Sequence, residues 1–149
     1  MRRNRVAAKM SLVMNSQVLD PRSPRPGAKT LPGGNRVDIV GESFYGKAIR
    51  EVLALVGPGV QMWASLIPDP ENPYDPNAVK VVIAGRHVGH LDRDVAIVFL
   101  PVARRIRELG CEAQCSAVIG GGGGRPSVAL DLGTPDDCLD CLNEVGEPS

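Results

Sequence analysis

Apolar residues alternate with other residues in several short stretches of the chain, which is the pattern of half-buried β-strands. In the stretch 60–67, for example, Val60, Met62, Ala64 and Leu66 fall on one face. Other stretches are short and rich in β-branched residues, and Gly or Pro bounds them. The strands that these patterns predict are residues 37–40, 60–67, 78–84, 87–91, 111–119 and 127–132.

Two longer stretches have their apolar residues at helical spacing. The first runs from Lys47 to Val56, and the sequence Gly-Pro-Gly that follows would end it. The second runs from Arg93 to Leu109, with Asp92 as its expected N-cap. Pro101 lies inside this second helix, and we expect it to kink or split the helix.

The expected order is strand, helix, three strands, helix, two strands. This order is typical of a mainly β protein of the α+β class. It predicts a small, partly closed antiparallel β-barrel of about six strands, OB- or SH3-like, with two helices that cover it.

The composition divides the chain into three parts. Residues 1–36 carry eight basic residues and one acid among many prolines and glycines, so we expect a flexible basic arm. Residues 37–132 form the expected domain. Residues 133–149 carry five acids and no base, and we expect an acidic C-terminal tail. The arm would either attract nucleic-acid phosphates or remain a solvated tail.

Several classes of protein do not fit this sequence. No apolar run has the length of a membrane span, and polar residues interrupt the apolar stretch near the N-terminus, so no signal peptide is expected. We expect a cytoplasmic protein with reduced thiols. The glycines at 120–124 lack the Lys-Ser/Thr of a phosphate-binding loop. No catalytic triad and no ATPase motif is visible, so we expect no enzyme.

Three ordered stretches carry a resemblance to a known family. They are Val40–Tyr45, Asp69–Val81 and Val88–Ala96. The second is the most specific, because it contains Asn-Pro-Tyr-Asp-Pro-Asn-Ala and leads into a Val-Lys-Val strand. The third contains Gly-His-Leu just before the second expected helix. With these motifs, the part of the chain from Val37 to Leu132 resembles the HIRAN domain, a β-rich module that binds the 3′ end of single-stranded DNA.

The resemblance implies a DNA-binding site. Phe44, Tyr45 and Tyr74 would stack on bases. Asp75 would accept a hydrogen bond from the terminal 3′-hydroxyl and repel a phosphate in its place. His90 would lie near the same end, and basic residues would contact phosphates. The expected nucleic-acid-binding residues are therefore Phe44, Tyr45, Tyr74, Asp75, Lys80, Arg86 and His90.

One departure from the family affects the expected affinity. The motor proteins of the family carry an arginine where this chain has Ser43, and a tyrosine is usual where it has Phe44. A charge-assisted phosphate contact is therefore missing, and the expected domain has nine bases against eleven acids. We expect weaker DNA binding than in the motor proteins.

Other interpretations of the same residues remain open. Asp75 would then only cap its loop, Tyr74 would be a packing lid, Phe44 a core residue and His90 a structural residue. His87 is expected to be exposed on its strand. For the whole chain, the alternatives are a protein-interaction adaptor for a helicase or nuclease, acting in trans, and a metal-dependent hydrolase of nucleic-acid metabolism.

The four cysteines, Cys111, Cys115, Cys138 and Cys141, form two close pairs in the sequence. Such pairs occur in structural zinc sites. However, Cys111 and Cys115 would lie about 13 Å apart along an extended strand. We therefore expect no cofactor and free thiols, with zinc as the alternative.

Overall fold

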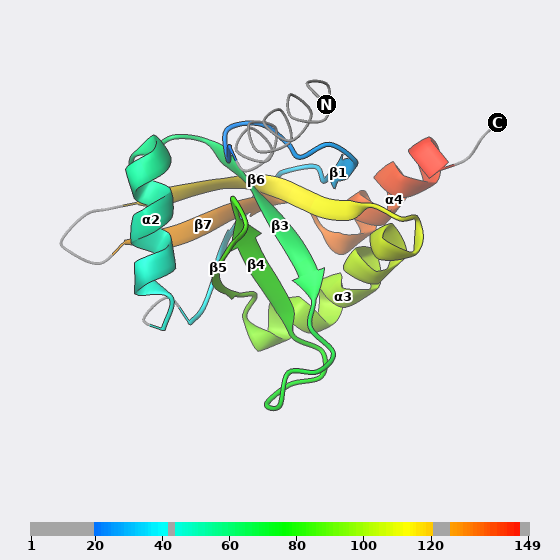
Figure 1. Ribbon diagram of the computed structural model, residues 1–149. Coiled ribbons are helices and arrows are strands. Elements are labelled where there is room, and N and C mark those ends of the chain that lie inside the picture. Colours follow the sequence, from blue (N-terminus) through cyan, green and yellow to red (C-terminus); the bar gives the residue numbers. More distant parts are fainter. Residues whose placement is uncertain (1–19, 42–43, 121–125, 147–149) are drawn as a thin grey trace, which may run out of the picture.

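The computed structural model describes residues 20–41, 44–120 and 126–146 (Figure 1). Six of its strands follow one another in the order β2-β7-β6-β3-β4-β5, and each is antiparallel to its neighbour. A seventh, β1, pairs in parallel with the first residues of β6. The strands are β1 Ala28–Thr30, β2 Asn35–Asp38, β3 Met62–Pro68, β4 Val79–Ile83, β5 Arg86–His90, β6 Glu112–Gly120 and β7 Ser127–Leu132.

The two ends of the sheet meet at a single residue pair. Val40, just after β2, forms an antiparallel bridge with His90 on β5. The Val40 amide donates to the His90 carbonyl at 2.9 Å, and the His90 amide donates to the Val40 carbonyl at 3.0 Å. This seam confirms the expected partly closed, mainly β barrel.

Three helices in the described part of the chain cover the barrel. They are α2 Gly46–Val56, α3 Arg93–Glu108 and α4 Pro135–Gly146. Helix α2 packs against β5, α3 packs against β3 and β6, and α4 packs against α3. Figure 1 shows α2 on one side of the sheet and α3 with α4 on the other. Among the described helices, none combines the length and the hydropathy that a bilayer crossing requires.

The core residues follow the predicted periodicity. On β4, Val79, Val81 and Ile83 are fully buried, while Lys80 and Val82 between them are partly exposed. On α2, Ile49 and Val52 are fully buried. Alternation in strands and spacing of three to four in helices place these side chains on one face of each element. The predicted helices and strands from Val37 to Leu132 are therefore present, with small shifts at their ends.

Pro101 does not split α3. The helix runs without interruption from Arg93 to Glu108, and the Asp92 carboxylate caps its start by accepting from the Asp94 amide at 3.3 Å. Pro101 is exposed on the outer face of the helix. One backbone hydrogen bond is lost there, but the buried side chains Leu100, Val102 and Ala103 hold the helix against the sheet on either side of the proline.

The segment before Val37 is more ordered than its composition predicts. Residues 1–19 lie outside the described part, but residues 20–36 contain β1 and the start of β2. The Leu31 amide donates to the Gln114 carbonyl at 2.7 Å, and the Leu31 side chain is buried. The Trp63 amide donates to the Pro21 carbonyl at 2.7 Å. Pairing with distant strands thus overrides the local preference of prolines and glycines for irregular structure.

The expected acidic tail contains a third helix, where two were predicted. The Asp137 amide donates to Thr134 Oγ1 at 3.1 Å, and the Thr134 amide donates to Asp137 Oδ2 at 3.3 Å. This reciprocal pair is a capping box, and Pro135 occupies the first helical position, which suits proline. Cys138 and Leu142, one turn apart, are buried in the core. Helix α4 therefore belongs to the domain.

Truncating α4's buried leucine tests this conclusion. Leu142→Ala is expected to lower the free energy of unfolding by about 2–3 kcal/mol, because a buried leucine leaves a cavity when it is shortened. Urea unfolding measures the change. Leu55→Ala is the control, since Leu55 also lies on a helix but is 52% exposed, and we expect a loss of less than about 1 kcal/mol. Equal losses in both variants would show that α4 does not contribute to the core.

Candidate nucleic-acid interface

A cavity of about 650 Å³ opens beside the seam of the barrel. Its walls are the segment after β2, the loop between β3 and β4, strand β5 and the start of α3. The three sequence motifs, which are far apart in the chain, meet here. Of the predicted site residues, the cavity brings together Phe44, Tyr45, Tyr74, Asp75 and His90.

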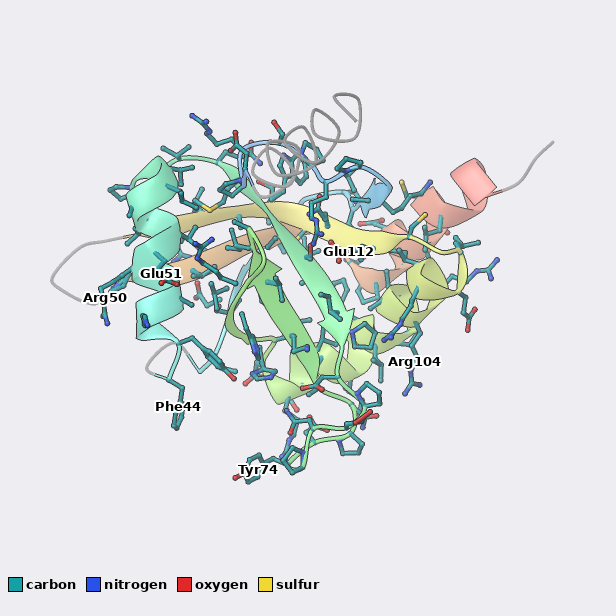
Figure 2. The ribbon with its side chains drawn as sticks, in the orientation of Figure 1. Phe44, Arg50, Glu51, Tyr74, Arg104 and Glu112 are labelled. Carbon is teal, nitrogen blue, oxygen red and sulfur yellow. The ribbon has the colours of Figure 1, made fainter. Side chains whose placement is uncertain are left out.

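Two aromatic rings stand at the rim of this cavity. Phe44 is 88% exposed and Tyr74 is 87% exposed. Figure 2 shows Phe44 below the start of α2 and Tyr74 at the end of the loop between β3 and β4, both pointing away from the barrel. Such exposure excludes a core role for Phe44 and a packing role for Tyr74. Two large apolar rings at one opening are suited to stacking on a flat partner.

Three further rings lie together in the cavity. The centroids of Tyr45 and His87 are 4.2 Å apart, and those of His87 and His90 are 4.7 Å apart. The Tyr45 and His90 rings lie edge to face at 5.9 Å. His87 is therefore half-buried in the site, and the expectation of an exposed residue is wrong.

The position of His87 follows from an irregularity of the sheet. Residues three apart on a regular strand point to opposite faces. The register between β4 and β5 shifts at Val81/Val82, a β-bulge, so His87 and His90 share a face. The His87 ring is held by a contact of 2.9 Å between Nε2 and the Gly89 carbonyl oxygen. Gly89 was the available signal, since a glycine inside a strand often marks such an irregularity.

Burial changes the acid-base properties of both histidines. It holds the pKa of His87 and that of His90 below the ordinary histidine value. For His90, Lys80 lowers the pKa further, and the Asp69 carboxylate opposes the shift. His90 Nε2 lies 3.9 Å from Asp69 Oδ2, and it is buried without a hydrogen-bond partner among the described residues.

The lowered pKa values predict a pH dependence of stability. The unfolded chain takes up protons on both imidazoles as the pH falls through about 6.5, whereas the folded protein takes them up only at lower pH. The unfolded state therefore binds more protons just below that pH, and the free energy of unfolding falls as the pH decreases.

Urea unfolding between about pH 7.5 and about pH 5.5 would measure this dependence. In a His87→Gln, His90→Gln variant the decrease is expected to be smaller than in the unchanged protein. An equal decrease in both proteins would assign the pH dependence to other groups.

The loop between β3 and β4 is stabilised by its own side chains. Asn72 Oδ1 accepts from the Tyr74 amide at 2.8 Å and from the Asp75 amide at 3.1 Å. Asp75 Oδ1 accepts from the Asn77 amide at 2.9 Å. One oxygen of Asp75 therefore caps the loop, as the alternative interpretation of this residue expected. The other, Oδ2, lies 3.8 Å from Nε of Arg93 and faces the cavity wall that Arg93 helps to form.

The basic residues are distributed differently from the expectation. Arg86 does not line the cavity, since its guanidinium pairs with Glu51 at 3.2 Å and donates to the Ala84 carbonyl. Lys80 is not part of the wall either, but it pairs across the strands with His90 and so lies on the same face. Arg93, which sequence reasoning missed, lines the cavity and is 74% exposed. Arg93 follows the Gly-His-Leu motif closely in the sequence, and this position could have indicated that it belongs to the site.

The cysteines form no metal centre in the described part of the chain. All four are free thiols, and no group of three metal-ligating side chains is present among the described residues. Burial raises the pKa of Cys115 far above its ordinary value and raises that of Cys138 to about 11. Without a bound metal, these two thiols therefore stay protonated at neutral pH.

Comparison with known proteins agrees with the motifs. The family model of the HIRAN domain matches residues 15–119. The crystal structure of the HIRAN domain of human HLTF is 25% identical, with 76% of this chain and 87% of that chain covered and a TM-score of 0.43. The NMR structure of the HLTF HIRAN domain in its DNA-bound conformation is 24% identical, with 78% and 91% covered and a TM-score of 0.41. No curated protein matches the chain in sequence. The family match spans more than half of the residues, and the chain belongs to the HIRAN domain family.

Proposed function

We propose that this domain binds single-stranded DNA and holds the nucleotide at a free 3′ end in the cavity beside the seam. The observation that carries the proposal is the meeting of exposed aromatic rings, a carboxylate and two half-buried histidines in one cavity of about 650 Å³. Family membership supports the class of ligand, since another HIRAN domain, that of HLTF, has a DNA-bound conformation.

The aromatic residues would bind bases without regard to sequence. Phe44 and Tyr74 are the most exposed of the large apolar side chains in the described part of the chain. A base that stacks on such a ring gains roughly 1–3 kcal/mol. The rings come from two different loops, so a terminal nucleotide that lies between them would contact both walls of the cavity.

Asp75 would distinguish a chain end from an internal nucleotide. Its Oδ1 accepts from the Asn77 amide within the loop, and among the described residues its Oδ2 has only the long contact with Arg93. A 3′-hydroxyl can donate to this oxygen. An internal nucleotide or a 3′-phosphate brings a negative charge to the same place, and the carboxylate repels it.

Electrostatic attraction would contribute little to the proposed binding. Arg93 is the only arginine or lysine among the residues that line the cavity in the described structure, and two carboxylates, Asp69 and Asp75, line it as well. Affinity would therefore depend on stacking more than on counterion release. We propose that such a module directs a helicase or a nuclease, acting in trans, to DNA ends in repair or at replication forks.

Fluorescence anisotropy with labelled oligonucleotides tests the function. Two strands of identical sequence would carry either a 3′-hydroxyl or a 3′-phosphate, with the label at the 5′ end. At low salt we expect the free hydroxyl to bind about tenfold or more tightly, which corresponds to about 1.4 kcal/mol. Equal affinities would exclude end recognition, and absence of binding for both strands would exclude the DNA-binding function.

A further inference from the structure

A second hollow, of about 230 Å³, lies on the other side of the loop that bounds the cavity. We call it the proline groove. Pro68, Pro70 and Pro76 form one side of it, and Leu100, Arg104 and Arg107 of α3 form the other. The cavity uses different residues of the same loop, namely Asp69, Asn72 to Asp75, and Ala78. One loop, stiffened by the hydrogen bonds of Asn72, is thus a wall of both hollows.

Helix α3 connects the two hollows. Arg93, at its start, lines the cavity, and Arg104 and Arg107, near its end, line the proline groove. Positions 93, 97, 104 and 107 are separated by intervals of four, seven and three residues, so they fall on one stripe of the helix. Between the arginines, Ile97 is 55% exposed. The two ends of the stripe therefore carry exposed guanidinium groups, while Leu100, which lies between Ile97 and Arg104 on the same stripe, is buried at the proline groove.

The two arginines of the groove are available to bind an anion. Neither Arg104 nor Arg107 has an ion pair within the described residues, and both are exposed. The groove contains one carboxylate, Glu108, which lies 3.6 Å from the guanidinium of Arg105. The negative charge in the groove is therefore compensated by a third arginine, and the positive charge of the other two is not.

We propose that Arg104 and Arg107 form a second phosphate-binding subsite, which holds the strand several nucleotides away from the end bound in the cavity. This inference rests on the proposed function, because it makes one continuous single strand the occupant of both hollows. Arg93 and Arg104 are eleven residues apart, which is about 16 Å along a helix. A strand stacked at about 3.4 Å per nucleotide spans that distance in about five nucleotides.

The subsite makes affinity depend on the length of the strand. A dinucleotide with a free 3′ end fills only the cavity, whereas a strand of about eight nucleotides reaches the proline groove. We expect the longer strand to bind about tenfold more tightly at low salt. Arg104→Ala and Arg107→Ala should each weaken binding of the longer strand about threefold and reduce its salt slope by about 0.7, the value for one phosphate contact on a single strand. Neither change should affect the dinucleotide.

Arg50→Ala is the matched control. Arg50 is an exposed arginine on α2 that lines neither hollow, and Figure 2 shows it on the opposite side of the molecule from Arg104. Its loss gives the same change in net charge. The inference is overturned if the longer strand binds no more tightly than the dinucleotide, or if Arg50→Ala weakens it as much as the groove variants do. If neither strand binds, the proposed function fails together with this inference, whereas 3′-hydroxyl preference without a length effect overturns the inference alone.

Discussion

Replacing Gly89 with alanine is expected to lower the free energy of unfolding by roughly 2–3 kcal/mol, which is large for one added methyl group. A Cβ atom at this position would lie 2.6 Å from the Val40 carbonyl oxygen and 2.7 Å from Cδ1 of Ile39. The first of these atoms belongs to the backbone of the seam and cannot turn away as a side chain can. The barrel must therefore open at the Val40–His90 pair to accommodate the methyl group.

The same substitution is expected to impair ligand binding. His90 follows Gly89 directly, and the Gly89 carbonyl oxygen orients the His87 ring. Urea unfolding measures the loss of stability, and anisotropy with a 3′-hydroxyl strand measures the loss of binding in the folded fraction.

Gly120→Ala is the control for this substitution. Gly120 also lies in a strand, and there the nearest atom to an added Cβ is Ser127 Oγ at an ordinary 3.6 Å. We expect this control to change stability by less than about 1 kcal/mol. A similar loss at both positions would refute the close approach at the seam.

Asp75→Asn is expected to abolish the preference for a free 3′-hydroxyl. The amide has the size of the carboxylate and keeps an oxygen that can accept from the Asn77 amide, so the loop should keep its conformation. Removing the charge removes the repulsion of a terminal phosphate. Affinity for the 3′-phosphate strand should therefore rise, and the ratio between the two strands should fall from about tenfold to less than about threefold.

Glu71→Gln is the control that separates a local effect from a general one. Glu71 is an exposed residue of the same loop, it does not line the cavity, and its substitution gives the same change in net charge. Anisotropy with the two strands should show the unchanged preference in this variant. Retained preference in D75N, or equal loss in E71Q, would contradict direct recognition of the end by Asp75.

The sequence predicted well those elements that depend on their own periodicity. Helix α2 was expected from Lys47 to Val56 and spans Gly46–Val56, and α3 was expected from Arg93 to Leu109 and spans Arg93–Glu108. Their buried stripes follow helical spacing, which is visible in the order of residues alone. The motif residues of the cavity were also identifiable, because Tyr74, Asp75 and His90 stand in stretches that resemble a family.

Elements that depend on distant partners were missed. Strand β1 has three residues in a segment rich in proline and glycine, and it exists because β6 offers it hydrogen bonds. The position of His87 depends on a bulge between two strands. Helix α4 is a different case, because Thr134, Pro135 and Asp137 are a start signal that the acidic composition of the segment obscured.

The single residue pair at the seam also has a consequence for motion. Most strand pairs of the barrel are held by several consecutive hydrogen bonds, whereas the ring closes through two, at Val40 and His90. Local opening at this place costs less free energy than unfolding of the whole domain. Amide hydrogens at the seam would then exchange with solvent faster than those of β3 or β6. Since the cavity lies along this seam, a bound strand would slow that exchange, and affinity would include the free energy of keeping the ring closed.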